Sequence, residues 1–203
     1  PEELPSLRTL RLTGTQMSEV ALPAGMTNLK TLDLSDNALE EITLPSGLTR
    51  LTSINLGINE LASLELPEDM TSLVTLNAFR NQLNSIQLPE GMKRLTYLNL
   101  QDNRLESIVF PSGLASLRTL SINENSLQGL HLNADMASLT SISLRNSDIE
   151  EFSLQGGGNL KTLDLSRSEV ETLLIDGEFE ALSRVSLPFV PSIITIPRHL
   201  RHH

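Results

Sequence analysis

Few residues in this 203-residue chain could support catalysis or metal binding, and their spacing suits neither task. The four histidines are His131, His199, His202 and His203. His131 stands alone between core positions, where a solvated histidine is the simplest expectation. His199 and His202 are spaced like weak metal ligands, but a histidine cluster at a chain end is more typical of a purification tag. We therefore expect segment 198–203 to be a frayed end that includes a tag remnant.

The carboxylates do not form a catalytic arrangement either. Glu40–Glu41 and Glu150–Glu151 are adjacent pairs, and both are expected to be solvated charge. Asp33, Ser35 and Asp36 could hold calcium only loosely. The sequence contains no zinc-protease, P-loop, dinucleotide-binding or nucleophile-elbow motif. Because no nucleophile, base and orienting group occur together, we predict a protein that is not an enzyme and that has no cofactor and no metal site.

Composition limits the partners. The net charge is −10, and an acidic chain repels phosphate backbones, so we expect no nucleic-acid binding. No stretch approaches the roughly 20 apolar residues needed to cross a bilayer, so we expect no membrane insertion. Cysteine is absent, which excludes disulfides and thiolate metal sites. The hydrophobic fraction of 39% is sufficient for a core, which must consist mainly of aliphatic residues because aromatic residues make up only 3%.

The elements that would position these residues follow a strict internal repeat. A leucine opens each unit, and successive opening leucines are 22 residues apart, except for one interval of 21 between Leu139 and Leu160. The unit reads L-x-x-L-x-L-x-x-N-x-L-x-x-[IL]-x-L-P, and its positions are numbered below from the opening leucine. The nine opening leucines are Leu7, Leu29, Leu51, Leu73, Leu95, Leu117, Leu139, Leu160 and Leu182.

The motif LxxLxLxxNxL, which recurs with its Asn intact in five consecutive units, resembles the leucine-rich-repeat family over essentially the whole chain. The second half of each unit echoes the first, which resembles the bacterial IRREKO-type subclass, although these units are slightly longer and carry a recurring Leu-Pro. The resemblance implies a bacterial source and one leucine-rich-repeat domain over residues 1–203. It also implies the fold: a solenoid of the α/β horseshoe class with about nine repeats, mostly parallel β-strands and little helix.

The hydrophobic pattern predicts the same architecture from physical grounds. Positions 4 and 6 are apolar between polar neighbours, which indicates a short strand over positions 3 to 7 with two side chains on one face. One such strand cannot bury its face alone, but stacked units can. Prolines in the second half favour extended or short 3₁₀ segments over long helices. At position 9, stacked asparagines are expected to satisfy turn backbone groups in unit after unit: Asn37, Asn59, Asn81, Asn103 and Asn125.

Positions 2, 3, 5, 7 and 8 are expected to line a concave sheet face, and their residues are mostly short and polar. Across nine units they hold nine basic and five acidic residues, a net charge of +4, which leaves −14 for the rest of the chain. Chance or a solubility requirement could produce this difference. The functional interpretation is a protein partner with an acidic surface, attracted to the inner face and repelled elsewhere.

The fourth unit departs from the pattern, because Ala78 replaces an inward leucine and Phe79 should point outward beside it. Exposed aromatic residues next to arginine are typical of binding hot spots. The alternative is neutral drift, with Phe79 covering the gap left by Ala78. The candidate binding residues are Ile58, Phe79, Arg80, Tyr97, Gln101, Arg118 and Arg145.

These patterns predict a protein-binding module that uses its concave sheet and belongs to a larger bacterial protein, with a secreted or cell-surface location favoured over the cytoplasm. A structural spacer or stalk and a carbohydrate-binding module are the alternatives. The chain begins mid-repeat and neither end resembles a polar cap. We therefore expect weak self-association through the N-terminal unit, whereas segment 188–191 is expected to fold over the other end.

Overall fold

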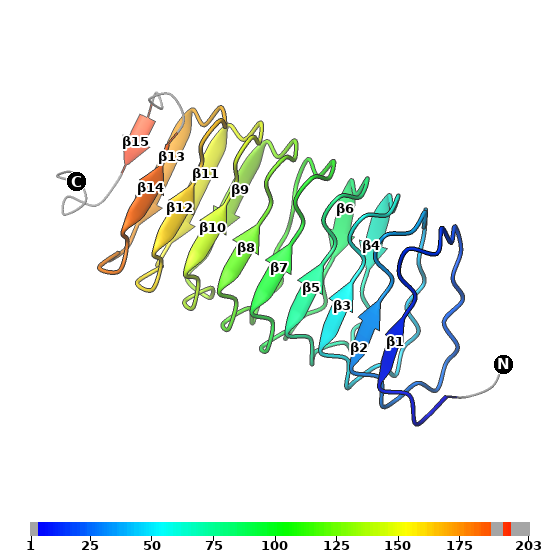
Figure 1. Ribbon diagram of the computed structural model, residues 1–203. Helices are drawn as coiled ribbons and strands as arrows, with labels where there is room; N and C mark the ends of the chain where they lie inside the picture. Colours follow the sequence, from blue (N-terminus) through cyan, green and yellow to red (C-terminus); the bar gives the residue numbers. More distant parts are fainter. Residues whose placement is uncertain (1–3, 188–192, 196–203) are drawn as a thin grey trace.

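The computed structural model describes residues 4–187 and 193–195, and this part of the chain contains fifteen strands and no helix. Nine strands form one parallel sheet in the order β1-β2-β3-β5-β7-β8-β10-β12-β14 (Figure 1). One strand comes from each unit, which confirms the predicted parallel solenoid. Their bounds are β1 Thr9–Arg11, β2 Thr31–Asp33, β3 Ser53–Asn55, β5 Thr75–Asn77, β7 Tyr97–Asn99, β8 Thr119–Ser121, β10 Ser141–Ser143, β12 Thr162–Asp164 and β14 Arg184–Ser186.

The second half of each unit returns along the opposite side of the stack and forms a second, incomplete wall. Two strands of this wall pair in one short sheet, and four pair in another, in the order β15-β13-β11-β9. Apart from the last, they begin at position 13 of their units. Their bounds are β4 Ser63–Glu65, β6 Ser85–Gln87, β9 Gly129–Leu132, β11 Glu151–Gln155, β13 Thr172–Asp176 and β15 Ile193–Thr195.

The core lies between the two walls as one continuous column of aliphatic side chains. In a representative unit, Leu51, Ile54 and Leu56 point inward from the first wall, and Leu64 and Leu66 point inward from the second. All five are buried, while Thr52, Ser53, Asn55 and Glu65, which alternate with them, are more exposed. Each layer is therefore closed only by its neighbours, as expected for a repeat protein whose units cannot fold alone.

The strands of the first sheet are shorter than the pattern predicts, covering positions 3 to 5 rather than 3 to 7. Position 8 takes a left-handed backbone in eight successive units, from Gly14 (φ 65°) to Arg167 (φ 60°). A residue in this conformation cannot continue an extended chain. The first wall therefore ends in a sharp turn at position 8, and this turn starts the path toward the second wall.

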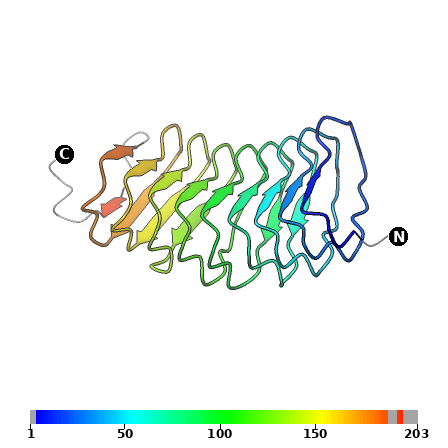
Figure 2. The same ribbon diagram turned by 60° about the horizontal axis from the view of Figure 1, so that its bottom comes forward.

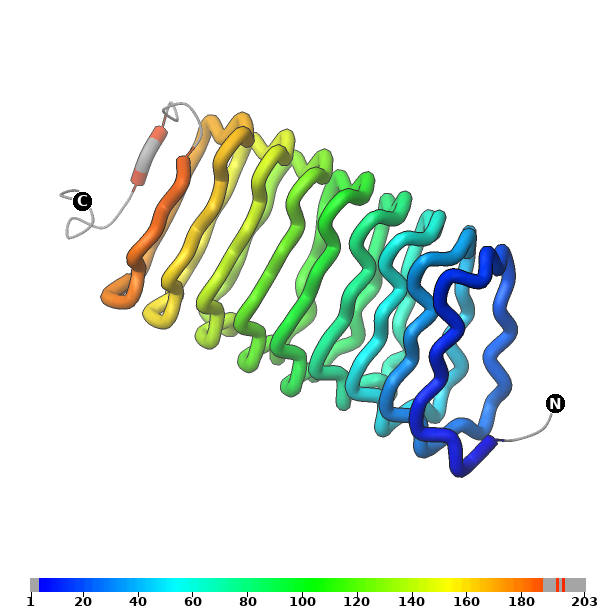
Figure 3. Tube along the Cα trace, in the orientation of Figure 1, coloured from blue at the N-terminus to red at the C-terminus, as the bar shows by residue number. Residues whose placement is uncertain are grey.

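The stack is elongated and only slightly bent in the two ribbon views and in the chain trace (Figures 1, 2 and 3). The horseshoe curvature of the fold class is therefore shallow in this chain. Neighbouring strands are about 4.8 Å apart, whereas packed helices need about 8–10 Å. Because both walls here are built from extended chain, they repeat at the same spacing and do not force the stack to curve.

Several expectations lie outside the described residues: the folding of segment 188–191 over the end, the frayed segment 198–203, and the three C-terminal histidines. Within the described ranges, no helix is present that could span a membrane.

Candidate protein-binding face

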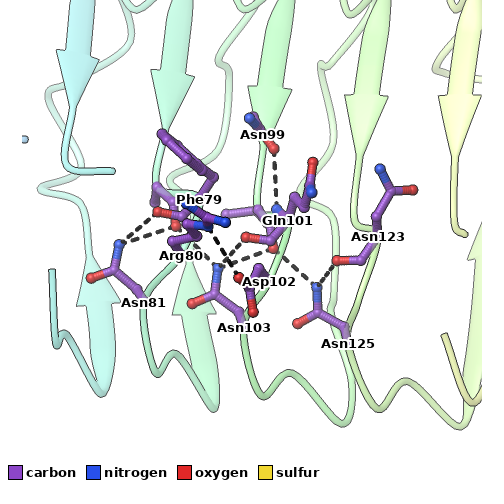
Figure 4. Close-up of polar contacts among 11 residues, drawn as sticks. Phe79, Arg80, Asn81, Asn99, Gln101, Asp102, Asn103, Asn123 and Asn125 are labelled. Atoms are coloured by element: carbon purple, nitrogen blue, oxygen red, sulfur yellow. Dashed lines mark hydrogen bonds and ion pairs between the residues drawn. The ribbon is translucent and has the colours of Figure 1, made fainter. Parts of the chain in front are cut away.

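The row of asparagines at position 9 bridges each unit to the one before it. The Oδ1 atom of Asn81 accepts the Leu61 N–H at 3.0 Å, and its Nδ2 donates to the Leu56 carbonyl at 2.9 Å. Nδ2 also contacts the Ala78 carbonyl of its own unit at 3.2 Å. Asn37, Asn59, Asn103 and Asn125 form the same set of bonds. These amides satisfy turn backbone and are structural groups (Figure 4).

Toward the ends, hydroxyl residues take the asparagine position and form fewer bonds. Ser168 Oγ donates to the Leu144 carbonyl at 2.6 Å, and the Ser147 N–H donates to Ser168 Oγ at 3.4 Å. At the other end, Thr15 donates its N–H and its hydroxyl to Asn37 Oδ1. A hydroxyl provides one donor where an amide provides two, so the bridges between terminal units are weaker.

The exposed side of the nine-stranded sheet, called the nine-strand face below, consists of positions 2, 3, 5, 7 and 8. Its central part, in the units that open at Leu51, Leu73 and Leu95, carries no charge at positions 2, 3, 5 and 7. At position 8 of these units, Arg80 pairs with Asp102 at 3.5 Å, and both side chains are about half exposed or more. The face therefore has a neutral centre between charged ends. A charge sum over the whole face, as taken from the sequence, hides this centre.

Ile58 occupies a costly position in this centre. It has a left-handed backbone with φ 57°, which is unfavourable for a β-branched residue. Its side chain is nevertheless 39% exposed, among the most exposed large apolar side chains of the described chain. Ile58 thus combines backbone strain with apolar exposure. In other units the equivalent position carries polar residues such as Asp102 and Asn146.

Phe79 lies over Gly57, the residue at its own position in the preceding unit. A Cβ atom added to Gly57 would lie 2.3 Å from Phe79 Cε1, so the ring fits only because glycine has no side chain. Phe79 is half-buried, and Ala78 beside it is fully buried. The ring lies against Gly57 of the preceding unit, whereas Tyr97 is in the following unit, paired with Thr75. Phe79 thus lies over the residue that precedes Ile58 in the chain.

Asn77 differs from its neighbours at position 5. Asn55 Oδ1 accepts the Gly57 N–H at 3.2 Å, and Asn99 Oδ1 accepts the Gln101 N–H at 3.1 Å. Asn77 instead turns its Nδ2 toward Asn55 Oδ1 at 3.1 Å, and its own Oδ1 is buried without a partner. An unpaired buried acceptor costs free energy. Asn77 and Gly57 are functional candidates that the sequence analysis missed, although a glycine at position 7 was a visible signal.

The remaining candidate residues surround this centre. Gln101 lies at position 7, next to Arg80 and Asp102 at the carboxyl ends of the strands (Figure 4). Tyr97 is half-buried at the start of β7. Arg118 is exposed, and Arg145 pairs with Asp164 at 3.7 Å.

The groups first considered for chemistry are not arranged as a catalytic or metal site in the described part of the chain. His131 lies on the second wall, where its Nδ1 is 2.7 Å from Ser153 Oγ on an exposed strand surface. Asp33 Oδ1 accepts bonds from the N–H and hydroxyl of Ser35, which is a local turn arrangement. Across residues 4–187 and 193–195, no three histidine or acidic side chains gather closely enough to hold a metal ion.

The parallel walls, the asparagine row and the open sheet face define a class of protein, the β-solenoid built from stacked leucine-rich units. The chain belongs to the leucine-rich repeat family, because the profile described as "Leucine Rich repeats (2 copies)" matches residues 5–46, 27–68, 71–116 and 93–133. The matching profile describes repeats and indicates no catalytic family. No curated protein matches the sequence significantly.

Solved structures share the fold at low sequence identity. The leucine-rich repeat domain of APL1B is 21% identical, with a TM-score of 0.71, over 95% of this chain and 57% of that one. The plant peptide hormone receptor RGFR1, solved in complex with RGF2, is 22% identical, with a TM-score of 0.69, over 96% and 36%. The functional domain of InlJ from Listeria monocytogenes is 20% identical, with a TM-score of 0.63, over 90% and 44%. The chain thus spans between about a third and somewhat more than half of these relatives' lengths.

Proposed function

We propose that the chain is a protein-binding module whose nine-strand face holds the partner, with the neutral centre around Ile58 and Phe79 as the main contact. The observation that carries this proposal is the strained, 39% exposed Ile58 beside a Phe79 ring seated on Gly57. Departures from local rules that nothing within the fold compensates are characteristic of functional sites.

The energetics of the neutral centre suit a contact surface. Desolvating a neutral polar sheet costs less than desolvating ions, and Asn55, Asn77 and Thr75 already bond mainly among themselves and their neighbours. Apolar side chains from a partner would cover Ile58 and Phe79, where aromatic residues dominate binding energy. Tyr97, Arg80 and Gln101 complete the contact area.

We also propose that the partner presents an acidic surface, since the nine-strand face is positive and the remainder of the chain is strongly negative. Arg118 and Arg145 belong to the positive C-terminal part of the face. Such complementarity raises association rates and is reduced by salt. Family members with known complexes include the plant receptor RGFR1, which binds RGF2.

The test is capture of a partner by the wild-type chain and by a variant with Phe79→Ala and Tyr97→Ala. We expect the captured protein to be lost from this variant while its melting temperature shows that it is folded. The matched control replaces exposed apolar residues of the second wall, Val109→Ala and Leu174→Ala, which are 84% and 42% exposed. Equal capture by the wild type and the first variant, or equal loss in both variants, would overturn the proposed face. A chain that acts only as a structural spacer would show no difference in capture between the wild type and the first variant.

Two further proposals concern the whole protein. The chain is part of a larger bacterial protein of the IRREKO-like kind, a proposal supported by the internally duplicated units and by the similarity to bacterial structures from Listeria monocytogenes and Leptospira interrogans. The chain also self-associates weakly through its first unit, where Leu4 is 44% exposed.

A further inference from the structure

The net positive charge of the nine-strand face comes from one margin of the sheet. Positions 5, 7 and 8, at the carboxyl ends of the strands, hold four basic and five acidic residues. Positions 2 and 3, at the amino ends, hold five basic residues and no acid. Both ion pairs of the described chain lie among positions 5, 7 and 8. Among the described residues, the cations at the amino ends therefore form no ion pair with a carboxylate.

Backbone hydrogen bonds place the position-2 residues in single file along the whole stack. The Lys30 N–H donates to the Arg8 carbonyl at 2.8 Å, and the same bond recurs from unit to unit until the Ser183 N–H reaches the Lys161 carbonyl at 3.0 Å. This row contains four cations, which are Arg8, Lys30, Arg118 and Lys161. All four side chains are exposed.

The turn just before each unit adds cations to the same margin. Positions 21 and 22 carry Arg50, Lys93 and Arg94, all exposed, and Arg50 Nη1 donates to Asn28 Oδ1 of the previous turn at 2.6 Å. With Arg184 at position 3, eight of the fifteen lysines and arginines lie at positions 21, 22, 2 and 3, against one acid, Glu180. We call these eight residues the cationic strip.

Apart from Glu180, the acids closest to the strip residues in sequence are separated from them by a buried residue. Asp33 follows Lys30 beyond Leu32, Asp164 follows Lys161 beyond Leu163, and Glu90 precedes Lys93 before Met92. With Glu180 included, positions 21, 22, 2 and 3 thus carry a net charge of +7, and the rest of the chain carries −17, which gives the total of −10. Neighbouring like charges destabilise the free protein, so an anionic partner along the strip would relieve this repulsion.

We propose that the cationic strip binds an extended acidic polypeptide segment that runs along the solenoid axis, across the strands. The proposal rests on the proposed function and specifies the chemistry of the partner. Nine strands about 4.8 Å apart give a strip roughly 38 Å long, which matches about 12 residues of extended chain. Carboxylates on alternate residues of such a segment recur every ~6.6 Å, which lies between the separations of about 4.8 and 9.6 Å for cations one or two units apart.

The strip suits a polypeptide better than a nucleic acid. Duplex DNA carries one charge per about 1.7 Å, far denser than the strip, and the −17 elsewhere would repel it. Single-stranded nucleic acids also need aromatic platforms for their bases, and the strip consists of lysines and arginines. By contrast, the hydroxyls and amides at positions 3 and 5 lie beside the strip and can bond to a peptide backbone.

The experiment measures binding of fluorescent poly-L-glutamate by anisotropy at about 0.01 M and about 0.15 M salt, where screening lengths are about 30 and 8 Å. The strip variant combines Arg94→Glu with Arg118→Glu. The control combines Arg104→Glu with Val109→Glu and Leu174→Glu, which changes the net charge equally but lies outside both the strip and the nine-strand face. We expect the dissociation constant of the strip variant to rise at least about tenfold, and that of the control to stay within about twofold.

Equal effects of the two variants, or no binding of poly-L-glutamate by the wild type at low salt, would overturn the cationic strip as the site. Tighter, strip-dependent binding of single-stranded DNA or of a polyuronate would overturn the acidic polypeptide as its occupant. These outcomes are separate from the proposed function, because partner capture depends on Phe79 and Tyr97. If the strip variant binds poly-L-glutamate as the control does, while Phe79→Ala with Tyr97→Ala still loses the partner, only the strip is rejected. If the strip variant loses poly-L-glutamate but Phe79→Ala with Tyr97→Ala still captures the partner, only the neutral centre is rejected.

Discussion

At the scale of single residues, the position-9 asparagines join consecutive units through bonds that no other side chain at that position supplies in full. Asn81 is 9% exposed and bonds three carbonyls and one N–H, and two of these four groups are in the preceding unit. The hydroxyls of Ser147 and Ser168 provide fewer bonds. The strength of the contact between neighbouring units therefore depends on residue type at one position.

Replacing Asn81 by leucine should lower the free energy of unfolding by about 1–3 kcal/mol, because it leaves buried backbone groups without partners. Equilibrium urea denaturation measures the change. The control is Asn84→Leu, at an exposed position with no side-chain hydrogen bond in the described structure, and it should change stability by no more than ~0.5 kcal/mol. If the two variants unfold alike, the row is not a structural requirement.

Ile58 provides a second residue-scale prediction, because strain and function should oppose each other there. Ile58→Asn should raise the free energy of unfolding by about 1 kcal/mol, since asparagine tolerates the left-handed backbone better. Asn146 occupies the equivalent position at φ 52°, and the reverse change Asn146→Ile should be destabilising by a similar amount. Thermal unfolding compares the pair, and a loss of stability in Ile58→Asn would contradict the assignment of strain.

At the scale of elements, the second wall is interrupted in its middle. Segment 107–110 lies between β6 and β9, and none of its four residues makes a backbone hydrogen bond to a neighbouring unit. Position 16 of this unit is Phe110, which is half-buried, whereas Leu88 and Leu132 at the same position are buried. We infer that the larger ring keeps this segment outside the ladder, while the first two units, with Leu22 and Leu44 at this position, also form no second-wall strand.

Phe110→Leu should therefore allow segment 107–110 to pair with β6 and β9. We expect slower amide hydrogen exchange at Ile108 and Val109, and a gain in stability of about 1 kcal/mol. Phe110→Tyr keeps the ring and should leave the exchange rates as they are. Exchange at Val109 that is equally fast in all three proteins would exclude ring size as the cause of the interruption.

At the scale of the whole molecule, each layer is stabilised only by its neighbours, so the two end layers are the least covered. No described residue pairs with the outer edge of β1, and Leu4 and Thr9 are exposed there. An open edge with apolar flanks favours pairing with a second copy.

We expect sedimentation velocity of the 203-residue chain to show concentration-dependent dimers. Leu4→Lys with Thr9→Lys should suppress them, because charges on an edge prevent strand pairing. Val109→Lys, on the second wall, should have no such effect. A strict monomer at millimolar protein, or dimers equally sensitive to both changes, would show that the first unit is not the contact.

The amino-acid sequence by itself determined the repeat length, the nine parallel strands, the buried positions and the asparagine row. It could do so because each unit contacts only its neighbours, so a one-dimensional pattern translates directly into stacked layers. The features that only the tertiary structure decided depend on contacts between side chains of neighbouring units, which are about 22 residues apart in the sequence. The lean of Phe79 over Gly57 and the unpaired Asn77 Oδ1 are of this kind. So is the alignment of Arg50 and Arg94 with the position-2 cations, because the fold brings the turn before each unit to the margin of the sheet.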